Sequence, residues 1–598
     1  MRISDYIADF LVKNGIRHCF SVTGGGAMHL NDALGHHEGL ACIYHHHEQA
    51  CAMAAEAYTR FSGELAVVCV TSGPGGTNAI TGVFGGYTDS VPMLILSGQA
   101  KRETLATSYP ELDLRQLGDQ ECNIAKMVSG ITKYAVTVRE PSEMAYHLEK
   151  ALYLATEGRG GPVWLDIPLD VQGAEVELPF SHHFDPASEF FAPVPTFSGS
   201  VAREILTRIH RAAAPLILIG TGVRLSGSIP KLLALLDKLK IPAAVAWNAN
   251  DALPFDHPSF AGMPGTVGTR AGNFALQNCD LLLSLGCRLN IRMIGYNRFD
   301  FAKNAYQIVV DLDENELKKP TVRADMPVWG DVGAVLDALL RESYEVAPRH
   351  APWLAWCQET VRKYPVVLPT YRSTKTTALN PYVFLDTLFS CLTEQDRIVC
   401  SNGSACVMTF QAAKIKAGQR MFTNSGCAAM GYGLPAALGV ALADRTSRVV
   451  CIEGDGSIMM NLQELATLAH NQLNVKILLL NNGGYHSIRQ TQQNLFGGRF
   501  VGLDAKSGIA FPDFSLIAEA FGIDYARIEG ELSQKQLTEA LDGPCARLIE
   551  VVVDKTQDFA PKCSAKRLPN GRLVSPSLDD MAPFLSREEY SAIRYQKQ

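Results

Sequence analysis

The sequence lacks a long apolar segment, a strong excess of charge of either sign and a short repeat. No run approaches the ~20 consecutive apolar residues that a membrane-spanning helix needs. Lys and Arg total 54 and Asp and Glu total 61, giving a formal charge of −7. This mild acidity argues against a nucleic-acid-binding surface. The 50 glycines follow no Gly-X-Y period, which excludes a collagen-like chain. We therefore expect neither a nucleic acid nor a membrane as partner.

The cysteines of this sequence show no paired spacing. The 15 cysteines are scattered from Cys19 to Cys563, and none forms a C-x-x-C motif. A chain of this length needs no disulfides for stability, so we expect reduced thiols and a cytoplasmic location. Charges at Arg2 and Asp5 interrupt any signal-peptide core, and apolar residues at helical spacing over 3–11 predict an amphipathic helix instead.

Short runs rich in Val, Ile and Leu alternate with helical patterns along the chain. Runs that are apolar on both faces are typical of parallel sheets covered by helices. The fold class is therefore α/β, with three doubly wound parallel-sheet domains. Predicted strands are Ala66–Val70, Met93–Leu96, Val163–Asp166, Leu216–Ile219, Leu281–Leu285, Ile308–Asp311, Val449–Ile452 and Lys476–Leu480.

Composition shifts divide the chain. Residues 173–199 and 341–377 are typical of linkers, although Trp353–Tyr364 has a helical pattern. Expected domains are 1–175, 190–345 and 375–555, followed by a tail, 556–598, predicted to cover the active-site region.

The most informative stretch is a strand–helix–strand unit in the third domain. Its first strand runs into Gly454–Ser457 and its second into Asn481-Asn482. Right-handed crossover places both loops at the carboxyl edge of one sheet, so Asp455 and Asn482, 27 positions apart, should converge. A carboxylate, an amide oxygen and a nearby carbonyl form the oxygen set that Mg²⁺ prefers.

The same unit has features of a phosphate site. Gly454 and Gly456 let the backbone approach a phosphate, and Ser457 is expected to open a helix whose amino end favours an anion. The alternative is two ordinary strand-end turns. The combination of both loops in one unit at this spacing favours the metal–phosphate interpretation.

The GDGS…NN pattern resembles the thiamine diphosphate and Mg²⁺ signature of a decarboxylase–carboligase superfamily. This resemblance implies Asp455, Asn482 and the Gly484 carbonyl as metal ligands. The segment Asn424–Leu434 is similar to the loop under the cofactor, where Met430 would hold the cofactor bent. The implied cofactor contacts are Glu48, Pro74, Asn78, Asn402, Gly403, Ser404, Ala428, Met430, Gly454, Asp455, Gly456, Ser457, Asn482, Gly484 and Tyr485.

A second candidate site lies near the amino terminus, in ACIYHHHEQACAMAAEA. The three histidines His45–His47 could indicate a metal site. Adjacent residues of a strand point to opposite faces, however, so all three cannot bind one ion. By resemblance, Glu48 contacts the cofactor's pyrimidine ring and shares a proton with it. Gly25 would line the thiazolium ring. Gln120 matches a substrate-side glutamine of the acetohydroxyacid synthase (acetolactate synthase) pattern.

The middle domain agrees with that branch of the family, which binds FAD. The domains would then be pyrimidine-binding, nucleotide-binding-like and diphosphate-binding. A structural FAD is expected, because joining two oxoacids transfers no net electrons; a nucleotide fold that no longer binds its ligand is the alternative. The FAD-binding residues that the resemblance implies are Gly220, Gly222, Gly265, Thr266, Arg288, Arg292 and Asp311.

Departures from the pattern concern the second substrate. Asn290 and Ile291 stand where two acidic residues usually precede the match to Arg292, and a tryptophan expected near Thr491 is absent. Arg489 and Arg499 could meet an anionic acceptor, although solvated surface arginines are equally consistent. The segment beginning at Gly484 is closer to synthase-like carboligases found with sugar-modifying pathways.

The resemblance implies decarboxylation of pyruvate, or of a similar 2-oxoacid, and ligation of the hydroxyethyl unit to a second carbonyl compound, as in acetolactate synthase. Alternatives are another acceptor such as a ketosugar, or simple decarboxylation. A non-catalytic nucleotide-binding protein is disfavoured because Glu48 and Asp455 are retained. A homodimer or homotetramer with active sites between subunits is expected, and a regulatory subunit is left open.

Overall fold

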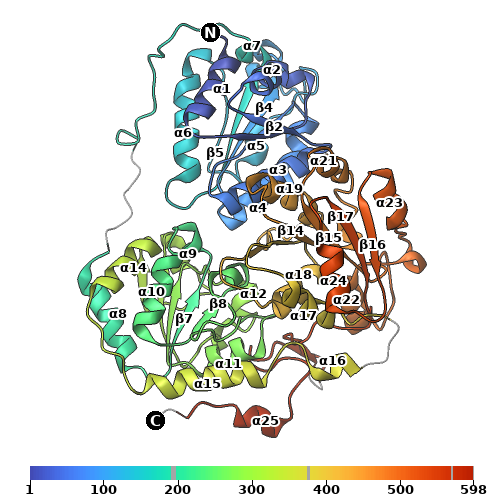
Figure 1. Cartoon of the computed structure of the whole chain (residues 1–598). Coiled ribbons are helices and arrows are strands. Elements are labelled where there is room, and N and C mark those ends of the chain that lie inside the picture. Colours follow the sequence, from blue (N-terminus) through green and yellow to red (C-terminus); the bar gives the residue numbers. More distant parts are fainter. Residues whose placement is uncertain (190–196, 374–377, 568–569, 597–598) are drawn as a thin grey trace.

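A computed structural model describes residues 1–189, 197–373, 378–567 and 570–596. It contains three parallel sheets, each flanked by helices, and Figure 1 shows the three corresponding units side by side. We refer to them as the N-terminal, middle and C-terminal units. The predicted α/β class and the three doubly wound sheets are confirmed. The expected domain starts at residues 190 and 375 lie outside the described residues.

The N-terminal unit is a six-stranded sheet of order β2-β1-β3-β4-β6-β5. Its strands are β1 (His18–Ser21), β2 (Ala41–Tyr44), β3 (Val67–Val70), β4 (Met93–Gln99), β5 (Tyr134–Thr137) and β6 (Pro162–Pro168). Its helices are α1 (Ile3–Lys13), η1 (Gly25–Ala27), α2 (Met28–His36), α3 (Glu48–Ser62), α4 (Pro74–Asp89), α5 (Ile124–Val128), α6 (Met144–Thr156) and α7 (Leu169–Gln172).

The middle unit has a five-stranded sheet of order β11-β10-β9-β7-β8. Its strands are β7 (Pro215–Ile219), β8 (Ala243–Val245), β9 (Leu281–Leu285), β10 (Tyr306–Asp311) and β11 (Met326–Trp329). Its helices are α8 (Gly199–Arg211), α9 (Gly222–Leu225), α10 (Ile229–Leu239), η5 (Trp247–Ala252), α11 (Arg270–Asn278), α12 (Ile291–Ile294), α13 (Glu314–Lys318) and α14 (Val332–Arg341).

The C-terminal unit repeats the strand order of the N-terminal unit, as β13-β12-β14-β15-β17-β16. Its strands are β12 (Arg397–Cys400), β13 (Arg420–Phe422), β14 (Val449–Gly454), β15 (Val475–Asn481), β16 (Asp524–Ile528) and β17 (Arg547–Val552). Its helices are α17 (Pro381–Cys391), α18 (Ser404–Ala412), α19 (Gly433–Ala443), α20 (Asp455–Ile458), α21 (Glu464–His470), α22 (His486–Phe496), α23 (Phe514–Ala520) and α24 (Gln534–Leu541).

All eight strands predicted from apolar runs are present, with ends shifted by a few residues. The amphipathic start is α1, which buries Ile3, Ile7 and Leu11. The single helix expected after Ser457 is instead two short helices, α20 and α21. Ser457 lies inside α20, which begins at Asp455.

The N-terminal and C-terminal units share a hydrophobic core. Helix α3 lies between α4 and α19 (Figure 1) and buries ten consecutive residues from Ala50 to Thr59. Small side chains make this possible: a Cβ on Gly439 of α19 would lie 2.1 Å from the carbonyl oxygen of Ala54. The close approach of these helices fixes the N-terminal unit against the C-terminal unit.

Helix α15 (His350–Lys363) follows the middle unit and confirms the helical pattern over Trp353–Tyr364; α16 (Pro369–Ser373) follows it. The tail contains β18 (Lys566–Arg567), β19 (Leu573–Val574) and α25 (Arg587–Ala592). Near its start Lys562 donates to Gln490 of α22, and farther on Tyr595 packs on Trp353. The described tail therefore contacts both the C-terminal and middle units.

Candidate active site

The loops after β14 and β15 converge as their strand order predicts. Asp455 accepts hydrogen bonds from three backbone N–H groups, those of Gly456 at 2.8 Å, Asn482 at 3.2 Å and Gly484 at 2.9 Å. Strands β14 and β15 are adjacent and parallel, with Gly454 opposite Leu480, so both loops leave the same sheet edge. The carboxylate of Asp455 therefore holds the two loops together.

This edge fits a divalent cation. The Asn482 side-chain oxygen is buried and has no hydrogen-bond partner among the described residues. Burial raises the pKa of Asp455 to about 6, although the backbone donors around it oppose that shift. A buried carboxylate beside an unpaired amide oxygen suits a hard cation, which would compensate both groups. The described residues contain no cluster of three His, Cys, Asp or Glu side chains for a metal. An amide, a carbonyl and phosphate oxygens would have to complete the ligand set.

Two further loops surround the Asp455 edge. Ser457 is hydrogen bonded to Ser401 at 2.6 Å and accepts from the Gly431 N–H at 2.9 Å. Asn402 donates to the Ala429 carbonyl at 2.7 Å. Met430 is 39% exposed beside them. We call Asn402–Ser404, Ala428–Met430, Gly454–Ser457 and Asn482–Tyr485 the C-terminal half-site.

The backbone at this half-site approaches its neighbours closely. A Cβ on Gly456 would lie 2.3 Å from the ring of Tyr485. Gly403 has a φ of +80° and precedes α18, and its Cβ position lies 3.9 Å from the hydroxyl of Ser487. The residues expected to bind phosphate therefore lie together at one sheet edge. One of their loops leads into the start of α18, a nine-residue helix.

A second cluster lies at the carboxyl edge of the N-terminal sheet. Glu48 begins α3 and accepts a hydrogen bond from the Asn78 amide at 3.0 Å. Its other oxygen lies 3.7 Å from the Cβ position of Gly75, beside the exposed Pro74. The carboxylate is therefore held by one donor, with its second oxygen turned toward the loop after β3.

Gly25 and Gln120 flank this cluster. Gly25 is exposed and begins η1, and the adjacent Gly26 donates to Thr71 at 3.0 Å. Gln120 is exposed with a φ of +56°, and its carbonyl oxygen would lie 2.4 Å from a Cβ on Gly73. We call Gly25, Glu48, Pro74, Asn78 and Gln120 the N-terminal half-site.

The three histidines before Glu48 do not share one ion. The His45 imidazole lies 2.7 Å from Glu464 of α21, and both side chains are fully buried. His47 instead caps α3, accepting from the Gln49 N–H at 3.1 Å. Burial alone would raise the pKa of Glu464, but hydrogen bonds from His45 and neighbouring donors outweigh it and leave the pKa lowered. His45 thus attaches the Glu48 loop to the C-terminal unit.

A cavity of about 290 Å³ lies between the N-terminal and middle units. We call it the groove. It lies at the carboxyl ends of β7, β9 and β10, the usual ligand position in such sheets. It is lined by all seven residues expected to bind FAD, Gly220, Gly222, Gly265, Thr266, Arg288, Arg292 and Asp311.

The residues that depart from the family pattern have local partners. Asn290 caps α12, accepting from the Met293 N–H at 3.1 Å. Thr491 is exposed on α22. Arg489 is paired with Asp504 at 3.2 Å, whereas Arg499 is exposed.

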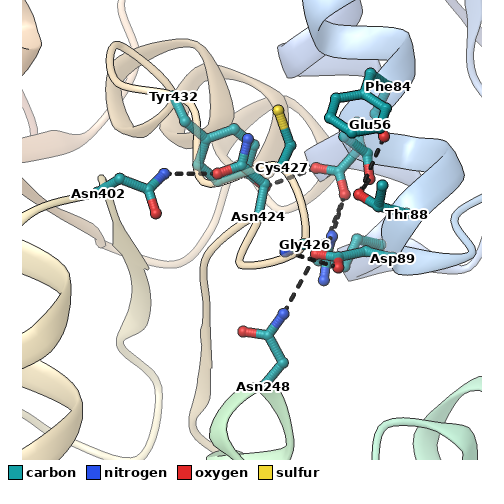
Figure 2. A network of polar contacts seen from close by, with 12 residues as sticks. Glu56, Phe84, Thr88, Asp89, Asn248, Asn402, Asn424, Gly426, Cys427 and Tyr432 are labelled. Carbon is teal, nitrogen blue, oxygen red and sulfur yellow. Dashed lines mark hydrogen bonds and ion pairs between the residues drawn. The ribbon is translucent and has the colours of Figure 1, made fainter. Parts of the chain in front are cut away.

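Sequence reasoning missed a buried ionic cluster formed by Glu56, Arg60 and Asp89, of which Arg60 and Asp89 line the groove. Figure 2 shows Glu56 and Asp89 close to the segment that contains Asn424, Gly426 and Tyr432. A signal was present, because Glu56 and Arg60 stand four residues apart in an otherwise small and apolar helix.

Comparisons with known proteins match all three units. Family models of the thiamine pyrophosphate enzymes match residues 1–125 (N-terminal TPP binding domain), 202–339 (central domain) and 401–551 (C-terminal TPP binding domain). The acetolactate synthase large subunit of Pyropia yezoensis is 33% identical over 562 residues, which is 93% of this chain and 92% of that protein.

Two bacterial relatives agree. The acetolactate synthase isozyme 1 large subunit of Escherichia coli (strain K12) is 33% identical, covering 93% of this chain and 95% of that protein. The acetolactate synthase large subunit of Lactococcus lactis subsp. lactis is 31% identical, covering 94% of each.

Proposed function

Because the chain belongs to the thiamine pyrophosphate enzymes, and among them to the acetolactate synthase large-subunit family, we propose that it decarboxylates pyruvate or a similar 2-oxoacid and ligates the hydroxyethyl unit to a second carbonyl compound. Acetolactate formation from two pyruvates, with release of CO₂, is the leading reaction. Thiamine diphosphate with Mg²⁺ supplies the centre that stabilises the carbanion left by decarboxylation.

The observation that carries this proposal is the pairing of Asp455 with Asn482. A buried carboxylate and a buried, unpaired amide oxygen at the ends of adjacent strands form an oxygen site for Mg²⁺, with the Gly484 carbonyl as the proposed third ligand. The diphosphate would complete the coordination, contacting Asn402–Ser404 and Gly454–Ser457. Tyr485, Ala428 and Met430 would bound the rest of the cofactor.

Glu48 is the proposed catalytic acid–base group. Asn78 fixes one oxygen of the carboxylate, which leaves the other free to hold or release a proton at the pyrimidine ring. Gly25 and Pro74 would leave room for the ring system. Gln120, on the loop beside Gly73, would orient the oxoacid substrate.

We propose that two chains complete each active site, in a homodimer or a dimer of dimers. Glu48 and Asp455 belong to different units, and each half-site has exposed apolar neighbours, Met28 and Met430, that suit burial against a second copy. The relatives' names as large subunits make a smaller regulatory partner a further candidate. None of the 15 cysteines, all of which lie in the described ranges, forms a disulfide, which supports a reducing compartment such as the cytoplasm. No helix in the described ranges has the length and apolarity to cross a membrane.

The groove is proposed to hold FAD in a structural role. Its seven candidates line one cavity at the carboxyl edge of the middle sheet, where Asp311 at the end of β10 would meet a ribose hydroxyl. Arg288 and Arg292 supply cations for a diphosphate. Because the ligation transfers no net electrons, the flavin would stabilise the assembly of units and take no part in the chemistry.

The acceptor is the least constrained part of the proposal. The polar, exposed Thr491 lies near the place where a tryptophan is expected, and Asn290 caps a helix where an acidic residue is usual. These changes favour an acceptor more polar than a second pyruvate, such as a ketosugar, as the second candidate function.

Product analysis tests the proposal. The purified protein with thiamine diphosphate, Mg²⁺ and pyruvate should release CO₂ and form acetolactate. If pyruvate alone gives little product, adding a ketosugar should give a mixed ligation product. Acetaldehyde as the single product, with every acceptor, would contradict ligation; absence of CO₂ release would contradict the whole assignment.

A further inference from the structure

A buried ionic cluster lies where the N-terminal unit, the groove and a cofactor-side loop meet (Figure 2). Glu56 and Arg60 are one turn apart on α3, and Asp89 is the last residue of α4. The Arg60 guanidinium lies 2.7 Å from Glu56 through Nε and 2.8 Å from Asp89 through Nη2. All three side chains are more than nine-tenths buried.

The cluster carries two carboxylates but one guanidinium, so it depends on donors from outside. Tyr432 donates to Glu56 at 2.6 Å, the Gly426 N–H donates to Asp89 at 3.1 Å, and the Asn248 amide donates to Asp89 at 3.3 Å. Buried carboxylates are costly to leave without such partners. The negative charge of the two carboxylates therefore holds these three donors in place.

Two of the donors bracket one segment, which we call the cofactor loop, residues 424–432. Gly426 lies near its start and Tyr432 is its end. Gly426 fits so tightly that a Cβ would lie 2.5 Å from the Asp89 carboxylate and 2.6 Å from the Thr88 hydroxyl. The loop between these anchors carries Met430, which is proposed to contact thiamine diphosphate. The cluster thus sets the position of the cofactor loop.

The same loop also contacts the diphosphate side of the site. Asn402 donates to the Asn424 side-chain oxygen and to the Ala429 carbonyl, both at 2.7 Å (Figure 2). Asn402 belongs to the C-terminal half-site. A displacement of the cofactor loop at Gly426 would therefore also move Asn402, which orders the backbone proposed to bind the diphosphate.

The cluster also forms part of the groove wall. Arg60, Asp89, Asn248 and Ser425 of the cofactor loop all line the groove. The two polar groups of the Asn248 side chain differ in their contacts. Its amide N–H binds Asp89, whereas its buried oxygen has no hydrogen-bond partner in the described parts of the chain. That oxygen is available to a ligand that offers a hydroxyl or amino donor, as a ribose or an adenine does.

We propose that the ionic cluster couples the groove to the thiamine diphosphate site, through Asn248, Asp89 and the Gly426 N–H. A nucleotide ligand that donates to the Asn248 oxygen fixes the amide against Asp89, and Asp89 in turn fixes the cofactor loop in its binding geometry. The inference rests on the proposed binding of FAD and thiamine diphosphate. Asn248 and Asp89 are positioning residues in it, because neither touches the reacting atoms.

Reciprocal linkage gives this proposal a quantitative form. If FAD tightens thiamine diphosphate binding by some factor, thiamine diphosphate must tighten FAD binding by the same factor. Couplings between sites in proteins are typically about 5- to 150-fold. We expect a factor in that range here, because the link consists of two buried hydrogen bonds to one carboxylate.

The test measures binding and does not depend on turnover. Full-length protein stripped of both cofactors is titrated with thiamine diphosphate in Mg²⁺, with and without saturating FAD, by calorimetry. The ratio of the two Kd values is the coupling factor. Flavin fluorescence, titrated with and without thiamine diphosphate, should give the same factor from the other direction.

Asn248→Ala is the diagnostic variant. It should reduce the coupling factor to about 1. Any weakening of thiamine diphosphate binding caused by the lost donor to Asp89 would be equal with and without FAD, and so would cancel in the ratio of the two Kd values. Arg288→Ala is the matched control. It removes a groove residue that lies outside the cluster, so it should weaken FAD binding but retain the coupling factor at saturation.

The possible results distinguish the coupling from the proposed function on which it rests. FAD binding with a factor of 1 in the parent, or an unchanged factor in Asn248→Ala, would overturn the coupling and leave the proposed function standing. Failure of FAD to bind at all would overturn the groove assignment, and the coupling with it.

Discussion

Replacing Glu464 should destabilise the joint between the N-terminal and C-terminal units. Its carboxylate accepts from the His45 ring at 2.7 Å, the His46 N–H at 3.1 Å and the Thr467 hydroxyl at 2.7 Å. Glu464→Ala leaves three donors without an acceptor in a fully buried place. Breaking a buried pair from one side costs about 3–5 kcal/mol. We expect a loss of stability in that range.

His45→Ala should cost less, about 1.5–3 kcal/mol, because the carboxylate keeps two of its three donors. The double variant should cost less than the sum of the single variants by at least about 0.5 kcal/mol, since the two groups satisfy each other. The measurement is urea unfolding followed by near-UV circular dichroism. Glu539→Ala, which removes an exposed partner of Lys535, is the control and should change the free energy of unfolding by less than about 0.5 kcal/mol.

The pH dependence of the Glu464 contribution has a defined sign. The pKa of Glu464 is lower in the folded protein than its ordinary 4.5, so its stabilisation is present above that pH and is lost as the pH falls through the folded value. The difference between parent and Glu464→Ala should shrink in acid. Additive single-variant costs, or a difference that grows on acidification, would refute the reasoning about this pair.

Three further predictions concern other parts of the molecule. Gly484→Ala should weaken Mg²⁺-dependent binding of thiamine diphosphate by about 10- to 100-fold, because its Cβ would lie 2.0 Å from the Leu503 carbonyl. Gly483→Ala meets no atom within 4 Å but places Ala at a φ of +70°, so it should weaken binding less than Gly484→Ala in calorimetry; equal losses would contradict the site. Burial raises the pKa of Asp166 to about 6 from 3.8, so the folded state binds more protons in that range and about 3 kcal/mol of stability is lost as the pH rises through it. Asp166→Asn removes the titrating group, but its amide NH₂ cannot accept from all of the Ser97, Gln99 and Thr137 donors. The unfolding temperature of the variant relative to the parent should therefore rise between pH 4 and pH 8, and the opposite trend in thermal scans would refute the assignment. Arg292→Ala should retain less flavin through purification than Arg298→Ala, which lies outside the groove lining, as read from the visible yellow absorption band; equal retention would count against the groove as a flavin site.

The sequence predicts the class of fold well because its signals are local. Strands such as Leu281–Leu285 are apolar on both faces, and their burial in parallel sheets follows directly. The convergence of Asp455 and Asn482 was also predictable, because a strand–helix–strand unit fixes which loops share a sheet edge. One local detail was wrong: the helix expected after Ser457 is two short helices, α20 and α21.

The contacts between units could not be predicted in the same way. The pairing of His45 with Glu464 joins residues 419 positions apart. Asp89 meets Arg60 only because α3 and α4 pack side by side through small residues. Such pairs depend on the relative placement of whole units, which no local pattern specifies. The acidic Glu56 within an apolar helix signalled a buried partner but did not identify Tyr432.

Subunit complementation tests the central claim most directly. Glu48→Ala and Asp455→Ala should each lower acetolactate formation from pyruvate by at least about 10²–10⁴-fold when assayed alone. When the two variants are co-expressed in equal amounts, about a quarter of parental activity should return. Half of the dimers are then mixed, and each mixed dimer has one intact site, in which Glu48 of one chain meets Asp455 of the other. No recovery in isolated mixed dimers, or near-normal activity of either single variant, would contradict an active site built from these two residues across a subunit boundary.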